Sequence, residues 1–189
     1  MLPIIPRMPD EGSISTARPG DGGDRSGYPE AMTGGRTVTA LRLLLPAFLL
    51  GAIVAISFLE APLKFLAPGI TIPLGLGIGR LVFTALNVLA GAVLLALTAV
   101  SIRARAGRPS ALLLGGLWLV FLVEVIVIRP ILNRRSDLVI AGQEAPGTDG
   151  AHYAYIVADV TMVVLLVALL VVTVRAVLPP RASLPTTDV

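Results

Sequence analysis

Long apolar stretches alternate with polar connections along this chain, and they predict four membrane-spanning helices. The stretches Leu43 to Leu59 and Leu81 to Ile102 contain no charged residue, and Ala111 to Leu132 and Ala151 to Val174 contain few. A helix of about 20 apolar residues crosses the hydrocarbon core of a bilayer. The predicted fold is therefore all-α, a four-transmembrane-helix antiparallel bundle. The predicted helices are about 38–60, 80–102, 110–132 and 152–177.

Prolines and glycines mark the predicted helix ends. The first helix is expected to stop before Pro62, because the residue before a proline is pushed away from α geometry. Residues 61–79 are rich in proline and glycine, so we expect a connection there. Pro130 is expected to kink or end the third helix, and Pro179 and Pro180 to end the fourth.

The two ends of the chain are predicted to lie outside the bundle. Residues 1–36 are rich in Gly, Pro, Ser, Asp and Arg, a composition that cannot bury enough apolar surface to fold, so we expect a disordered N-terminal tail. Translation from either Met1 or Met32 fits this pattern. Residues 179–189 form a short polar C-terminal tail, and 37–178 form the predicted transmembrane domain.

Composition supports membrane residence and excludes several kinds of chemistry. The chain is 55% hydrophobic and 14% charged, whereas ordinary soluble domains are about 25% charged. It has no cysteine and one histidine, which excludes disulfides, thiolate metal sites and multi-histidine haem or copper sites within one chain. We expect no metal, no cofactor and no nucleic-acid partner.

Basic residues predict the orientation. Arg103, Arg105 and Arg108 share one short connection without acidic residues, and such clusters stay on the cytoplasmic side. Both termini are then cytoplasmic in a multi-pass protein of the inner membrane. The connections after the first and third helices face the cell exterior.

Ionisable and polar residues interrupt the apolar runs at matching depths. With a rise of 1.5 Å per residue, Asn87, Glu124 and Asp159 reach one level in the outer half of the bundle. Glu124 and Arg129 are five residues apart, so in an α-helix they do not face each other. Arg129 is expected to extend outward or to reach a carboxylate on another helix. The candidate buried polar layer comprises Glu60, Lys64, Arg80, Asn87, Glu124, Arg129, His152, Tyr155 and Asp159.

Two interpretations of this layer remain open. Its charges balance, which favours a structural set of ion pairs and hydrogen bonds between helices. Intramembrane carboxylates also mark functional sites, which favours the floor of a cavity that binds a small solute, an ion or a lipid head group.

Short motifs give a family resemblance. They are the segments Phe58–Phe65, Gly77–Phe83 and Arg129–Asn133, together with Asp137 and His152. In these motifs the chain resembles small uncharacterised four-helix bacterial membrane proteins similar to the cisplatin-resistance-associated transmembrane protein family. The resemblance implies a four-helix membrane fold over about 40–175 and implies no reaction.

The sequence favours a non-enzymatic protein that binds or moves a small solute or ion. One alternative is an accessory subunit, with a second copy or a membrane complex as its partner. The other is a membrane enzyme acting on a lipophilic substrate, with Glu124, Asp159 and His152 as acid–base candidates.

Overall fold

The structure is a computed structural model that describes residues 30–144 and 150–178. These residues form helices joined by short turns, with no strand in the described ranges. Four helical segments are long and apolar enough to cross a membrane. The all-α four-helix bundle is therefore confirmed. The spans are Gly35–Leu66, Ile72–Arg103, Arg108–Ile140 and Gly150–Val177.

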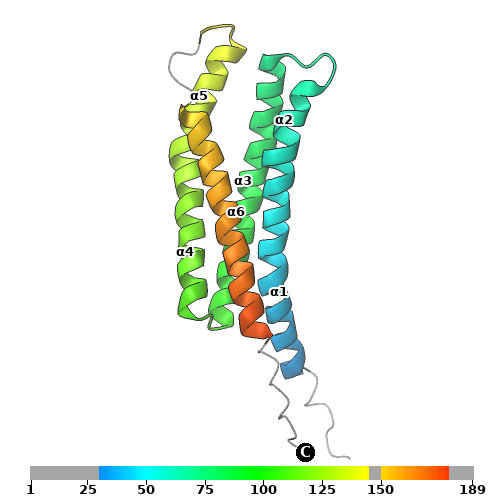
Figure 1. Cartoon of the computed structure of the whole chain (residues 1–189), viewed down its shortest axis with the longest axis vertical. Helices are drawn as coiled ribbons and strands as arrows, with labels where there is room; N and C mark the ends of the chain where they lie inside the picture. Colours follow the sequence, from blue (N-terminus) through cyan, green and yellow to red (C-terminus); the bar gives the residue numbers. More distant parts are fainter. Residues whose placement is uncertain (1–29, 145–149, 179–189) are drawn as a thin grey trace, which may run out of the picture.

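The spans run antiparallel as an elongated bundle (Figure 1). The first span packs against the second and fourth, and the third closes the ring by packing against the same two. Both described chain ends lie at one end of the bundle (Figure 1), which we call the terminal end. We call the opposite end the distal end.

The first span continues past the proline that was expected to end it. Helix α1 (Glu30–Ile53) passes into a π-helix, η2 (Val54–Glu60), and then into the short helices α2 (Ala61–Leu63) and η3 (Lys64–Leu66). Pro62 lies in the first turn of α2, where its missing N–H and its ring cost little. The wider turn of η2 therefore lets the helix pass the proline, and the predicted end before Pro62 was wrong.

The third span has the same arrangement, a π-helix followed by a proline in the first turn of the next helix. Helix α4 (Arg108–Val123) passes into the π-helix η4 (Glu124–Ile128), and α5 (Arg129–Ile140) follows with Pro130 in its first turn. A proline in a helix interior removes one hydrogen bond and clashes with a carbonyl one turn earlier. Because the π-turn precedes it, Pro130 does not end the helix, which continues about eight residues beyond the expected end.

Helix α3 (Ile72–Arg103) begins earlier than the predicted residue 80. The Thr71 side chain accepts a hydrogen bond from the Leu74 backbone N–H (3.4 Å) and caps the helix. Pro73 occupies the first turn, where proline is favoured. The expected connection 61–79 is therefore helical except around Ala67–Thr71, because capping and membrane packing outweigh the low helix propensity of its glycines.

Helix α6 (Gly150–Val177) agrees with the fourth predicted helix. The first part of the predicted disordered tail, residues 1–29, lies outside the described residues, whereas Glu30 to Arg36 are helical and part of α1. The predicted C-terminal tail 179–189 also lies outside the described residues.

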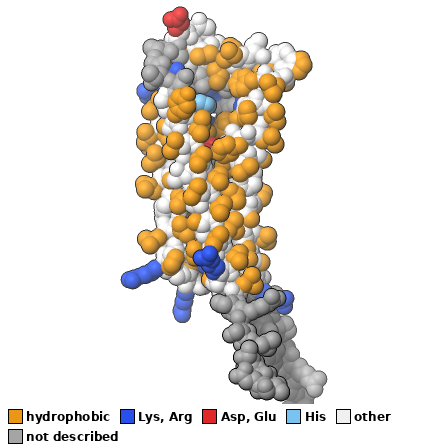
Figure 2. All heavy atoms as spheres, viewed as in Figure 1, with side chains coloured by type: hydrophobic (Ala, Val, Ile, Leu, Met, Phe, Trp, Pro, Cys, Tyr) orange, Lys and Arg blue, Asp and Glu red, His pale blue; other side chains and the backbone are white. Residues whose placement is uncertain are grey.

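The two halves of the bundle are packed differently. An apolar core that includes Leu49, Leu94, Leu117 and Leu166 fills the terminal half. Large apolar side chains cover the outside (Figure 2), as expected where lipid is the solvent. The distal half holds a much smaller apolar cluster around Ile128, Tyr155 and Ala158, and this is where the polar residues gather.

Candidate functional site

A cavity of about 500 Å³ opens in the distal half, between all four spans. The first span contributes residues of η2, α2 and η3, and the others contribute residues of α3, α5 and α6. Figure 2 shows the hollow in the upper part of the molecule, with basic, acidic and histidine atoms visible between apolar side chains. The charged residues in its wall are Lys64, Arg80, Arg129 and Asp159.

Asn87 joins an acid and a base below the cavity. In the amide orientation that satisfies both neighbours, Arg129 Nε donates to Asn87 Oδ1 (2.8 Å), and Asn87 Nδ2 donates to Glu124 Oε1 (3.1 Å). Glu124 is 3% exposed and Arg129 is 8% exposed. The amide therefore links two buried charges of opposite sign across α3 and the third span, as buried charges require.

The structure corrects the expected geometry of Glu124 and Arg129. Arg129 is buried and does not extend outward. The two residues flank one π-turn, in which the Arg129 backbone N–H bonds to the Glu124 carbonyl. In a π-turn, which has an i→i+5 hydrogen bond, residues five apart lie closer to one face of the helix than they do in an α-helix. The π-turn thus brings both side chains to Asn87.

Asp159 lies beside two hydroxyl groups at the cavity floor. Asp159 is 3% exposed and Tyr155 is 6% exposed, and both line the cavity with Ser57. The Ser57 and Tyr155 hydroxyls are adjacent to the Asp159 carboxylate, although neither meets strict hydrogen-bond geometry. Because all three side chains line the same cavity, we treat them as one polar cluster. A small void below the cavity is bounded by Asn87, Glu124 and Asp159.

Lys64 is held at the distal wall by an acid and by aromatic rings. Its Nζ lies 3.5 Å from Glu60 Oε2, 5.3 Å from the Phe83 ring centre and 5.6 Å from that of Phe65. The Arg129 guanidinium carbon lies 5.5 Å from the same Phe83 ring. Two cations thus contact one aromatic ring, an arrangement that favours cationic groups in a partly dry site.

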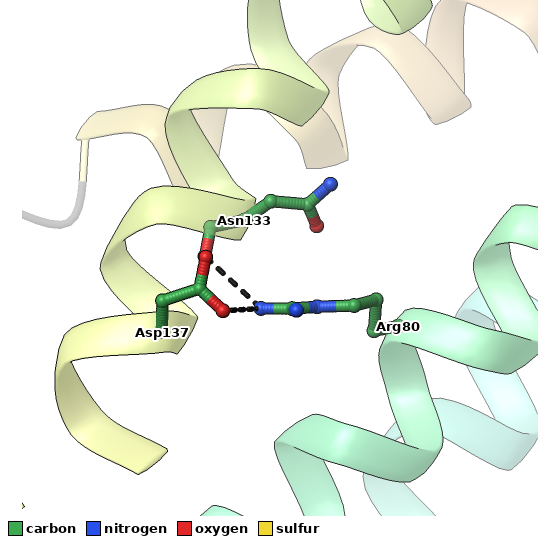
Figure 3. Close-up of polar contacts among 3 residues, drawn as sticks. All are labelled: Arg80, Asn133 and Asp137. Carbon is green, nitrogen blue, oxygen red and sulfur yellow. Dashed lines mark hydrogen bonds and ion pairs between the residues drawn. The ribbon is translucent and has the colours of Figure 1, made fainter. Parts of the chain in front are cut away.

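Arg80 ties α3 to α5 (Figure 3). Its Nη2 donates to the Asn133 backbone carbonyl (3.2 Å) and forms an ion pair with Asp137. Both partners lie on the part of the third span that extends past Pro130. Pairing of Arg80 with Asp137 was not predicted, because the predicted third helix ended at residue 132.

The structure brings most members of the predicted polar layer together. Eight of the nine line the cavity or the void below it, with His152 exposed at the rim. The ninth, Glu60, lines neither and pairs with Lys64. Sequence reasoning did not find the aromatic residue at the centre of the site, Phe83, which contacts Lys64, Arg129 and Tyr155. An isolated Phe in an apolar helix carries no signal that distinguishes a site from lipid contact.

Among the described residues no group of three or more histidine or acidic side chains could hold a metal ion. The arrangement instead offers cations, hydroxyls and one carboxylate around a partly apolar space. Such a surface can bind a small polar or amphiphilic molecule by charge and hydrogen bonding.

Comparison of the chain with protein-family models, with curated proteins and with solved structures found no match. The resemblance to the cisplatin-resistance-associated family therefore gains no support. What is established is a multi-pass membrane protein with four candidate spans.

Proposed function

We propose that this integral membrane protein binds a small solute in the distal cavity. One observation carries the proposal: side chains from all four spans converge on a cavity large enough for a small molecule, and charged groups line it. Charged and polar groups inside a membrane protein are costly and commonly mark ligand or ion pathways. The cavity is closed on the terminal side by the apolar core, which favours binding from one side over an open channel.

The cavity does not favour the enzymatic alternative. The acid–base candidates were Glu124, Asp159 and His152. Asp159 and His152 line the cavity, but Glu124 bounds the lower void, so the cavity does not bring the three together. A catalytic group must reach the substrate within hydrogen-bond distance. A binding role needs only the side chains that do line the space.

We also place the protein in the inner membrane with the distal end outside. Arg103, Arg105 and Arg108 lie at the terminal end, at the junction of α3 and α4, and basic connections remain in the cytoplasm. The cavity is then accessible from the outer leaflet or the cell exterior.

Native mass spectrometry of the protein purified in mild detergent tests the binding function. We expect wild type to retain a small molecule, Leu132→Trp to lose it while remaining folded because the larger side chain fills the cavity, and Ile131→Trp to retain it. Ile131 is the matched control because it is 48% exposed and does not line the cavity, whereas Leu132 does. A wild-type protein without any bound small molecule would contradict the proposal. A stoichiometric protein partner in the same sample would favour an accessory subunit.

A further inference from the structure

We propose that the ligand is an amphiphile with an acidic head group, a phosphate or a carboxylate, and that it enters the cavity sideways from the bilayer. This inference rests on the proposed binding function. It adds the chemical class of the ligand and its route.

The wall of the cavity is predominantly basic. Lys64, Arg80 and Arg129 line it, against one acidic residue, Asp159. Asp159 lies at the floor, beside the hydroxyls of Ser57 and Tyr155. An anionic group can therefore sit above the floor, among three cations.

The acids that pair with these bases lie behind them. Glu60 contacts Lys64, and Asp137 contacts Arg80, while Glu124 is bonded to Asn87. None of these three acids lines the cavity. They stabilise the cations in the empty protein, yet the charge that a ligand meets first is positive.

The two guanidinium groups keep hydrogen-bond donors for a ligand. Arg129 uses Nε to bond Asn87, and Arg80 uses Nη2 to bond Asn133 and Asp137. A guanidinium has five N–H donors, arranged to match phosphate or carboxylate oxygens. Donors in excess of acceptors indicate a ligand that is rich in acceptors.

The cavity is open toward lipid on one side. Helix α1 packs closely along α6, but η2 and α2, the distal continuation of the same span, make no extensive contact with α6. Phe58 of η2 and Ile156 of α6 line the cavity and are 43% and 39% exposed. These two apolar side chains flank the lateral opening, where an acyl chain would find a favourable surface.

The depth of the opening suits a lipid-like molecule. Spans of 28 to 33 residues are about 42–50 Å long, whereas the hydrocarbon core is about 30 Å thick. Phe58 and Ile156 lie about 12 Å and 9 Å below the distal ends of their spans at 1.5 Å per residue. The opening is thus near the boundary between head groups and acyl chains.

Four probes test the ligand class on the full-length protein in mild detergent. They are lysophosphatidic acid, palmitate, lysophosphatidylcholine with the same acyl chain as the first probe, and inorganic phosphate. We expect one or both of the acidic amphiphiles to bind, and the other two probes to bind at least about tenfold more weakly, which is the effect of a lost charge-assisted contact.

Paired variants test the contacts and the route. Arg80→Gln should weaken binding of the acidic amphiphile about tenfold, whereas Arg134→Gln, an exposed arginine outside the cavity wall, should not change it. Ile156→Trp should also weaken it by narrowing the opening. Val157→Trp should not, because Val157 is 63% exposed and does not line the cavity.

Each contrary outcome overturns a stated part of the inference. Equal binding of lysophosphatidylcholine overturns the acidic head group, and equal binding of inorganic phosphate overturns entry from the bilayer. Binding of none of the four probes overturns the ligand class. In that case a molecule retained by wild type and lost in Leu132→Trp would still support the binding function, so the two failures are distinguishable.

Discussion

At the scale of single residues, Asn87 has the most demanding position. It lies in the middle of a membrane helix, and its side-chain amide bonds to both Glu124 and Arg129. A neutral amide can donate to a carboxylate and accept from a guanidinium at the same time. Few other side chains can do this, since an acid or a base at this position would add a third charge to the layer.

Replacing Asn87 with leucine should destabilise the protein by about 2 kcal/mol, because both charged partners lose a hydrogen bond in a buried site. Unfolding in detergent, followed by circular dichroism, measures the change. Thr84→Val on the same helix is the control, since the Thr84 hydroxyl bonds to the Arg80 carbonyl of its own helix. An Asn87→Leu protein as stable as the control would show that the link contributes little.

The sequence predicted which polar residues share a depth, but not how they contact one another. Asn87, Glu124 and Asp159 were expected at one level because helical rise converts residue number into depth. In the structure all three line the same small void. The link from Glu124 through Asn87 to Arg129 was not predictable from α-helical spacing. It depends on a π-turn, and no residue pattern in Glu124–Ile128 distinguishes that turn from an α-turn.

At the scale of elements, the first and third spans share one design. Each has a π-turn, then a proline in the first turn of the next helix, and then a distal extension that lines the cavity. π-turns in helices are frequent at functional sites. The prolines were visible in the sequence, but their effect was misjudged because the widened turn before each one removes the clash.

The close packing of η3 against α3 depends on Gly75. A Cβ atom on Gly75 would lie 2.3 Å from Cε1 of Phe65, whereas a Cβ atom on Gly77 would meet nothing within 4 Å. Small residues allow such close approach between membrane helices. The glycine run 75–79 therefore includes positions with different tolerance.

Gly75→Ala should lower the free energy of unfolding by about 1–3 kcal/mol, because the Phe65 ring must move to relieve the overlap. Gly77→Ala is the matched control and should be neutral or slightly stabilising, since alanine favours helix by up to about 1 kcal/mol. Thermal unfolding of both variants in the same detergent compares them. Equal stability of the two variants would contradict the packing described for Phe65.

At the scale of the whole molecule, the bundle combines a filled half and an open half. Membrane residence and the number of spans were predictable from apolar length alone. A cavity above the polar layer was one of two interpretations that the sequence left open, because the cavity arises where η2 and α2 diverge from α6. That divergence is a property of tertiary packing, and local sequence does not encode it in a recognisable pattern.

The orientation can be tested directly, because the chain contains no cysteine. Single cysteines replacing Gln143 after α5 and Arg105 between α3 and α4 lie at opposite ends of the bundle and are exposed. A membrane-impermeant maleimide added to intact cells should label the first and not the second, as the basic connection predicts. Labelling of the cysteine at position 105 alone would reverse the orientation and place the cavity on the cytoplasmic side.

The unequal filling of the two halves has an electrical consequence. A transmembrane voltage acts on a charge with about 2.3 kcal/mol per 100 mV when the charge crosses the whole barrier. Because Leu49, Leu94 and their neighbours pack the terminal half, most of the voltage drop falls there. A charged molecule resting in the open half would therefore experience little of it, and its affinity should hardly change when the membrane is depolarised.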